Sequence, residues 1–208
     1  MKKLMLLPLL ALLCLQACKK DEPAEEQPEA AKPSDYFFPM KVGNYWVYES
    51  INSDGTNYRQ DTLHIDGDSI LNGRTYYHFQ HQLVPYVISA KGWYADSSGY
   101  ILSLEGGGPG VDITVEDTLS RLTPNGFDII ERVGNRDTAF TVTAGTFESI
   151  EVITDAYYLN EPVTGGGTNP RQAFAYHAKG VGTILNRYFF ISQTTTTTTQ
   201  LKSYNLEP

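Results

Sequence analysis

The sequence predicts an all-β fold: a single antiparallel, meandering domain of about ten to twelve strands, either barrel-like or an open half-barrel. Two observations lead to this prediction. Apolar and polar residues alternate with a period of two through most of the chain, which is typical of half-buried strands. Asn-Gly and Asp-Gly pairs recur between the alternating segments, and such pairs form the tight turns of hairpins. A β-sandwich is the alternative architecture.

An export signal is expected at the start of the chain. Two lysines are followed by an apolar run over residues 4–15, which is too short for a membrane-spanning helix of about 20 residues. The run ends in Leu15-Gln16-Ala17-Cys18, which resembles the lipobox of bacterial lipoproteins. The resemblance implies that residues 1–17 are a lipoprotein signal peptide and that Cys18 carries the lipid. An ordinary secretory signal is the alternative.

This signal accounts for both cysteines of the chain. Cys14 leaves with the signal peptide and Cys18 becomes a thioether, so the mature monomer is expected to contain no disulfide. The removal of two lysines also changes the formal net charge from −8 to −10. An acidic chain is a poor match for nucleic acid, whose phosphates are bound by lysine and arginine. The expected partner is the membrane, through the lipid on Cys18.

Residues 18–35 are expected to form the lipidated cysteine and a disordered tether. Positions 19–35 hold three prolines, six acidic residues, and no aromatic or β-branched residue, so this segment cannot bury enough apolar surface to fold. Fully extended, it reaches at most about 55–60 Å. Lys19-Lys20-Asp21-Glu22 resembles the charged export signals of Bacteroidetes surface lipoproteins. The predicted location is the outer membrane, at the cell surface or the periplasmic face.

The antiparallel β domain is expected over residues 36–208, because aromatic residues become frequent at Tyr36. The alternating segments predict strands at residues 45–51, 75–80, 111–116, 127–133 and 139–142. Hairpin turns are expected at Asp54-Gly55, Asn72-Gly73 and Asn125-Gly126.

The end of the domain contains a run of threonines. Residues 184–191 and the run 194–199 are expected to form two neighbouring strands with a turn at Ser192-Gln193, because threonine has good strand propensity. An adhesive or glycosylated threonine tract is the alternative interpretation.

Three short motifs lie along the domain. They are Phe38-Pro39 with Val42-Gly43-Asn44-Tyr45-Trp46-Val47-Tyr48, then Ala144-Gly145-Thr146-Phe147, then Ala178-Lys179-Gly180-Val181-Gly182. In this order they resemble a large group of uncharacterised lipoproteins and secreted proteins that is common in Bacteroidetes. The resemblance implies a single antiparallel β domain and brings with it no activity and no catalytic residue.

The sequence contains no familiar catalytic or metal-binding pattern. His78 and His81 are three residues apart and therefore face opposite sides of a regular strand, which is a poor arrangement for metal ligands. Neither Gly-x-Ser-x-Gly nor His-Glu-x-x-His occurs. We expect no cofactor, no metal and no catalytic residue. A carbohydrate-active hydrolase would have to assemble its carboxylates from distant strands.

Four triplets resemble the O-glycosylation acceptor of exported Bacteroidetes proteins, in which an aspartate precedes a hydroxyl residue and an apolar one. The candidate acceptors are Thr62, Ser69, Thr118 and Thr138. An aspartate in a turn before a strand produces the same triplet, and this is the alternative explanation.

Aromatic residues provide the remaining clue to function. Trp46, Trp93 and Tyr94 are candidate ligand-stacking residues, with core packing as the alternative role. The predicted function is a non-enzymatic binding or structural module of the cell envelope, displayed on a tether as a monomer, with a glycan or an apolar ligand as candidate partners. A periplasmic carrier that holds a lipid or apolar ligand in a half-barrel pocket, and a carbohydrate-active hydrolase, are the alternatives.

Overall fold

The computed structural model describes residues 32–81, 92–104, 118–122, 127–158, 170–189 and 194–208. These residues belong to one compact unit, Ala31–Pro208. The signal segment, Cys18, and residues 19–31 of the expected tether lie outside the described residues. The strand predicted at residues 111–116 and the turns predicted at Asn125-Gly126 and Ser192-Gln193 also lie outside them.

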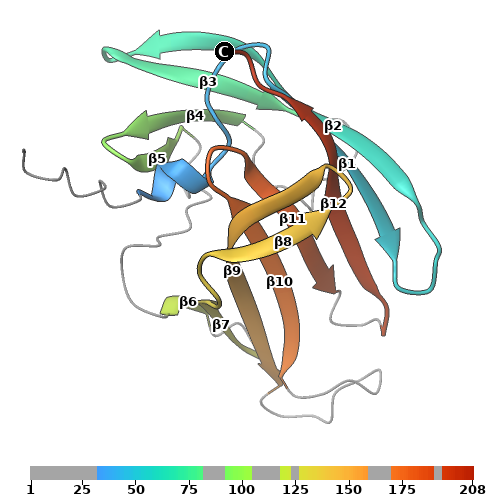
Figure 1. Ribbon diagram of the computed structural model, residues 1–208. Coiled ribbons are helices and arrows are strands. Elements are labelled where there is room, and N and C mark those ends of the chain that lie inside the picture. Colours follow the sequence, from blue (N-terminus) through green and yellow to red (C-terminus); the bar gives the residue numbers. More distant parts are fainter. Residues whose placement is uncertain (1–31, 82–91, 105–117, 123–126, 159–169, 190–193) are drawn as a thin grey trace, which may run out of the picture. The chain divides into compact units, whose positions relative to one another are not determined.

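The described residues contain one short 3-10 helix, η1 (Pro33–Tyr36), and twelve strands (Figure 1). The strands are β1 (Tyr45–Asn52), β2 (Arg59–Leu71), β3 (Arg74–Gln80), β4 (Gly92–Ser97), β5 (Tyr100–Ser103), β6 (Thr118–Leu122), β7 (Phe127–Val133), β8 (Thr138–Val142), β9 (Gly145–Tyr158), β10 (Arg171–Ala178), β11 (Gly182–Phe189) and β12 (Thr196–Asn205). The first three residues of helix η1 belong to the expected tether, and Tyr36 is the first residue of the expected domain.

All strands belong to one antiparallel sheet, so the predicted all-β antiparallel fold is confirmed. The order along the sheet is β5-β4-β3-β2-β1-β12-β11-β10-β9-β7-β6, and β8 also pairs with β9. Within the described residues the sheet is open, with β5 and β6 at its two ends, and it does not close into a barrel. Neighbouring strands are mostly consecutive in sequence, and the first and last strands pair at the centre, where Tyr48 lies opposite Leu201.

The turns predicted at Asp54-Gly55 and Asn72-Gly73 and the two C-terminal strands are found. Gly55 has φ of +79° in the turn before β2, and Asn72 and Gly73 have φ of +50° and +76° between β2 and β3. Such positive φ angles are what Asn-Gly and Asp-Gly turns supply. Strands β11 and β12 pair antiparallel, as expected for the threonine run.

Strand β1 shows which face of the sheet forms the core. Trp46 and Tyr48 are 0% and 2% exposed, whereas their neighbour Tyr45 is 40% exposed. We call the face that carries Trp46 and Tyr48 the inner face, and the opposite one the outer face. Phe79 of β3 and Tyr94 of β4 are buried on the inner face with Trp46.

The segment before the sheet completes this core, and we call residues 32–38 the N-terminal strap. Phe37 and Phe38 are 7% and 3% exposed, and the Phe38 ring centroid is 4.9 Å from that of Trp46. The strap is held by two backbone hydrogen bonds: Ser34 N donates to Gly99 O (2.9 Å) and Gly180 N donates to Asp35 O (2.7 Å). The strap therefore covers the aromatic part of the inner face.

The β8–β9 hairpin folds back over the central strands (Figure 1). Its turn reaches β12 through a hydrogen bond from Ala144 N to Leu201 O (3.1 Å). It reaches β1 through Thr143 Oγ1, which donates to Glu49 Oε1 (2.8 Å). Phe140 of the hairpin stacks on Tyr176 at 3.9 Å between ring centroids. These contacts hold the hairpin against the central strands, and Val142 of β8 is buried in the same core cluster as Trp46 and Tyr48.

Candidate ligand-binding surface

The candidate glycosylation sites fall in different environments. Cys18 and the side chain of Thr118 are outside what the structure describes. Ser69 is exposed near the end of β2, whereas Thr62 and Thr138 are half-buried. The carbonyl oxygen of Thr138 accepts a hydrogen bond from Ser149 Oγ (2.9 Å). Ser69 is thus the most accessible of the three acceptors that the structure describes.

Two of the three candidate stacking residues are part of the aromatic core. Trp46 is 0% exposed, and its indole Nε1 donates to Val181 O at 2.9 Å. Tyr94 is 3% exposed and packs edge-on against Phe79, with 5.5 Å between ring centroids. A ligand could stack on either ring only after the strap had moved away, because Phe38 contacts Trp46 and Phe37 contacts Tyr94.

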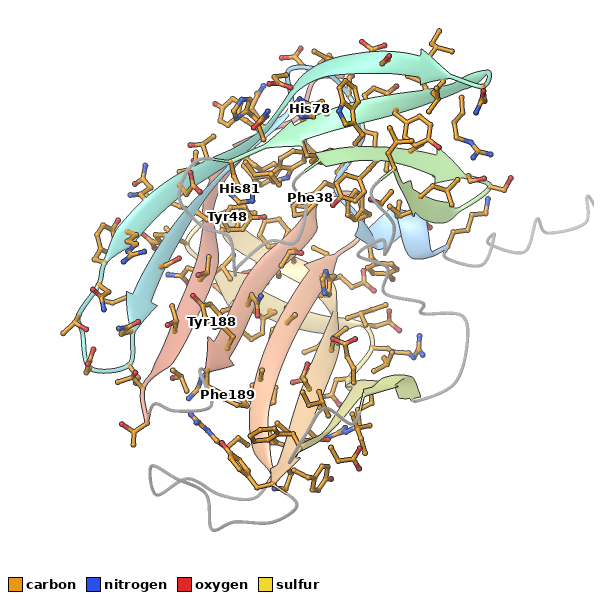
Figure 2. All side chains as sticks on the ribbon, turned by 180° about the vertical axis from the view of Figure 1, so that it is seen from behind. Phe38, Tyr48, His78, His81, Tyr188 and Phe189 are labelled. Carbon is orange, nitrogen blue, oxygen red and sulfur yellow. The ribbon has the colours of Figure 1, made fainter. Side chains whose placement is uncertain are left out.

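Trp93 lies on the outer face, opposite to its neighbour Tyr94, because adjacent strand residues point to opposite sides. It is half-buried and stacks on His78 of β3, with 4.5 Å between ring centroids and 25° between ring planes. Figure 2 shows His78 and Phe38 on opposite sides of the β2–β3 ribbon. Trp93 is therefore the candidate stacking residue that the fold leaves accessible.

A carboxylate lies beside this pair of rings, at a β-bulge. Ile65 lies opposite Phe79 and Gly67 lies opposite His78, so Asp66 is the extra residue of β2. His78 Nδ1 donates to Asp66 Oδ1 at 2.8 Å, and the Asp66 side chain is 41% exposed. Bulges of this kind often occur beside functional sites, where they redirect a side chain.

An amide completes the group. The distance from Gln80 Nε2 to His78 Nε2 is 3.3 Å. Because an amide N–H can only donate, His78 Nε2 is the acceptor and the imidazole carries its proton on Nδ1, facing Asp66. Both ring nitrogens are thus engaged and the imidazole is fixed in plane. We call Asp66, His78, Gln80 and Trp93 together the Trp93 surface.

Sequence reasoning identified Trp93 but not its three partners. His78 was considered as a metal ligand, for which its spacing from His81 is poor, and Asp66 and Gln80 carried no signal of their own. The glycine at position 67, inside an alternating strand pattern, is the signal that could have indicated a bulge. The pairing of β3 with β4, which brings His78 to Trp93, depends on the tertiary fold.

Buried titratable groups elsewhere are tied to the scaffold. Burial lowers the pKa of His177 to about 4, and Thr183 Oγ1 lies 3.2 Å from its Nδ1. Burial also raises the pKa of Tyr48 well above its usual range, and the Tyr48 hydroxyl donates to Thr183 O at 2.6 Å. His177 therefore links β10 to β11, and Tyr48 links β1 to β11.

A buried carboxylate organises the break between β7 and β8. Glu151 is 7% exposed, and it accepts hydrogen bonds from the Tyr176 hydroxyl (2.8 Å) and from Asn135 Nδ2 (3.1 Å). Burial is the main reason why the pKa of Tyr176 is raised to about 12. The hydrogen bond to Glu151 and the negative charge of that carboxylate raise it further. Each oxygen of this carboxylate thus accepts a hydrogen bond from another side chain, which indicates a structural role.

Another His–Asp pair lies at the border of the inner face. His81 Nδ1 is 3.8 Å from Asp61 Oδ2, and both side chains are 7% exposed.

Among the described residues, no group of three or more His, Cys, Asp or Glu side chains is placed to hold a metal ion. Nor does any described helix have the length and apolar character needed to cross a membrane.

Comparison with known proteins gives distant similarities only. No family model and no curated protein matches the sequence. A candidate lipoprotein of known structure from Parabacteroides distasonis ATCC 8503 is 12% identical, with 85% of this chain and 100% of that chain covered and a TM-score of 0.45. A candidate exported protein with a YmcC-like fold from Bacteroides fragilis NCTC 9343 is 14% identical, with the same coverage and a TM-score of 0.44. At these values the two similarities support no conclusion about the function of this chain.

Proposed function

We propose that this protein is a cell-envelope lipoprotein that displays a non-enzymatic β-sheet binding module on an acidic tether. Cys18 carries the lipid, residues 19–31 give the distance from the outer membrane, and the sheet presents its outer face to a ligand. Stable anchoring of a lipoprotein requires more than one acyl chain, each buried CH₂ contributing about 0.8 kcal/mol.

The observation that carries this proposal is the way the tether enters the domain. The N-terminal strap follows the acidic segment directly, and Phe37 and Phe38 are buried in the core. The residues that follow the acidic segment are thus packed into the domain, which supports a tether that ends at the core. A chain attached through an exposed, frayed terminus would lack this connection.

The filled inner face favours display over transport of an apolar ligand. The strap rings and the rings of Trp46, Phe79 and Tyr94 occupy the space on the inner face of β1 to β4. A carrier with a half-barrel pocket would need this space for its ligand. The outer face of β2 to β4, in contrast, carries accessible polar and aromatic groups.

Lipidation is tested by changing Cys18 to Ala and following the protein in membrane and soluble fractions. We expect the wild-type chain in the membrane fraction and the Cys18→Ala chain in the soluble fraction. Cys14→Ala is the matched control, because it removes a cysteine of the signal segment and should leave membrane association unchanged. If Cys18→Ala stays with the membrane, the lipid anchor is wrong.

Display is tested by protease treatment of intact cells. Loss of the β domain from intact cells indicates the cell surface, and loss only after the outer membrane has been permeabilised indicates the periplasmic face. Either outcome agrees with a tethered module, whereas recovery of the wild-type chain in the cytoplasm contradicts it.

A further inference from the structure

We infer that the Trp93 surface binds a neutral carbohydrate. This inference names the ligand class of the proposed binding module and in that respect depends on the proposed function. It does not depend on lipidation, since the four side chains lie together in the folded domain whether or not Cys18 is modified. The argument has three parts: the aromatic ring, the hydrogen-bonding groups and the charge.

Trp93 supplies an apolar platform that does not need to be ordered when a ligand arrives. Its indole is already stacked against His78, at 4.5 Å between ring centroids. His78 is held in turn by hydrogen bonds at both nitrogens, to Asp66 and to Gln80. Because the rings lose little freedom on binding, the entropic cost of ordering them is small. A sugar ring carries C–H groups on one face, and such a face packs on an aromatic ring.

Asp66 and Gln80 supply the polar groups that a sugar needs around its apolar face. A carboxylate accepts hydrogen bonds from hydroxyl groups, and an amide can both donate and accept. Asp66 points to the outer face because it follows Ile65, which is buried in the core, and it lies at the β-bulge beside His78. The combination of one aromatic platform with a few fixed polar groups is typical of small-ligand sites.

Charge selects a neutral ligand over an acidic one. The hydrogen bond to His78 uses Oδ1 of Asp66, and 41% of this side chain is exposed. The whole chain carries a formal net charge of −8. An acidic polysaccharide would bring further negative charge to an exposed carboxylate and would be repelled. Hydroxyl groups of a neutral sugar, in contrast, donate to that carboxylate.

The two tryptophans of the chain permit a direct test. The full chain with Cys18→Ala is labelled with 5-fluorotryptophan and gives one ¹⁹F NMR resonance from Trp46 and one from Trp93, which Trp93→Phe assigns. The probes are laminarin, mannan and xylan as neutral polysaccharides, and polygalacturonate as an acidic one. We expect at least one neutral probe to shift the Trp93 resonance and to leave that of the buried Trp46 unchanged. Polygalacturonate should shift neither resonance.

Matched substitutions on β2 test the carboxylate. Asp66→Asn keeps the side-chain shape and should weaken binding of the neutral probe about tenfold, the effect of losing a hydrogen bond to a charged group. Asp68→Asn makes the same change on the opposite face of the strand, since Asp68 pairs with Tyr77, and should bind as the unsubstituted chain does. Both substitutions are on an exposed part of β2 and should preserve the fold.

Two results would overturn the inference. One is that none of the three neutral polysaccharides shifts the Trp93 resonance of the unsubstituted, folded chain. The other is that Asp66→Asn and Asp68→Asn have equal affinity for a probe that does shift it. Binding is measured on purified protein in solution, so failure here is separate from a failure of the membrane anchoring that the Cys18→Ala fractionation measures.

Discussion

Phe38 packs directly against Gly182, the first residue of β11. A Cβ atom added to Gly182 would lie 2.5 Å from Cδ1 of the Phe38 ring, and Gly182 has φ of +99°. The absence of a side chain at this one position therefore lets the N-terminal strap reach the core. The two residues belong to separate motifs of the sequence, and the fold brings them together.

Gly182→Ala should strongly destabilise the domain, by about 2–4 kcal/mol, because the added methyl group meets the Phe38 ring and the backbone conformation is unfavourable for alanine. Urea unfolding followed by circular dichroism measures the loss. Gly180→Ala is the matched control, because Gly180 has φ of +69° and nothing within 4 Å of an added Cβ. It should lower the free energy of unfolding by only about 1 kcal/mol, because a positive φ is unfavourable for alanine. Equal losses for the two variants would contradict the steric role of Phe38.

Phe38→Ala should cost about 3–5 kcal/mol, because it removes a ring that is 3% exposed and leaves a cavity beside Trp46. Single domains have a total stability of about 5–15 kcal/mol, so the variant should also be cleaved faster by proteases near the strap. Ile70→Ala is the control, since Ile70 is 72% exposed and should change stability by about 0.5 kcal/mol or less. A Phe38→Ala variant as stable as Ile70→Ala would show that the strap is dispensable.

Glu49 should make the domain less stable in acid. The hydrogen bond from Thr143, with further bonds from Gln200 and Tyr58, lowers the pKa of Glu49. A lowered pKa in the folded state contributes stability above the unfolded value of about 4.3, and this contribution is lost as the pH falls through the folded pKa. Glu49→Gln should therefore lower stability at pH 7 and flatten the acid limb of the stability curve. Glu148→Gln, on the exposed part of β9, should leave that curve unchanged.

His177 should add a second pH dependence at higher pH. Burial lowers its pKa to about 4, whereas an unfolded histidine titrates near pH 6.5. Between these two values the unfolded chain binds more protons than the folded one. The uptake of a proton by His177 on unfolding therefore lowers the stability of the domain as the pH falls, by at most about 1.4 kcal/mol per pH unit. In an NMR titration the His177 ring should remain neutral at pH 5, and a midpoint near pH 6.5 would contradict its burial. His177→Gln should remove this part of the pH dependence from urea unfolding.

How far the sequence predicted the structure depends on the range of the interactions. Hairpin turns such as Asn72-Gly73 were predictable, because positive φ is a property of the residues themselves. The alternation at Trp46 and Tyr48 also predicted a strand. Which face is buried did not follow from alternation, because apolar residues occur on both faces of this strand.

The candidate surface was predictable only at Trp93. A single aromatic residue after a glycine is visible in the sequence, but its partner His78 comes from another strand. Asp66 joins them because it follows the buried Ile65 and lies at the bulge beside His78, which depends on how β2 pairs with β3. Local sequence reasoning cannot place such a group, because the strand register depends on pairing across the sheet.

By itself the sequence determined the antiparallel β architecture and the positions of its tight turns, and it indicated an acidic tether behind a lipobox-like cysteine. These are properties of short segments, in which side-chain period, turn residues and charge act locally. Only the tertiary structure decided that β1 pairs with β12, that Phe38 fills the space above Gly182, and that Asp66, His78 and Trp93 meet on one face. Those relationships come from packing and register between residues far apart in the chain, where each contact depends on the whole sheet being formed.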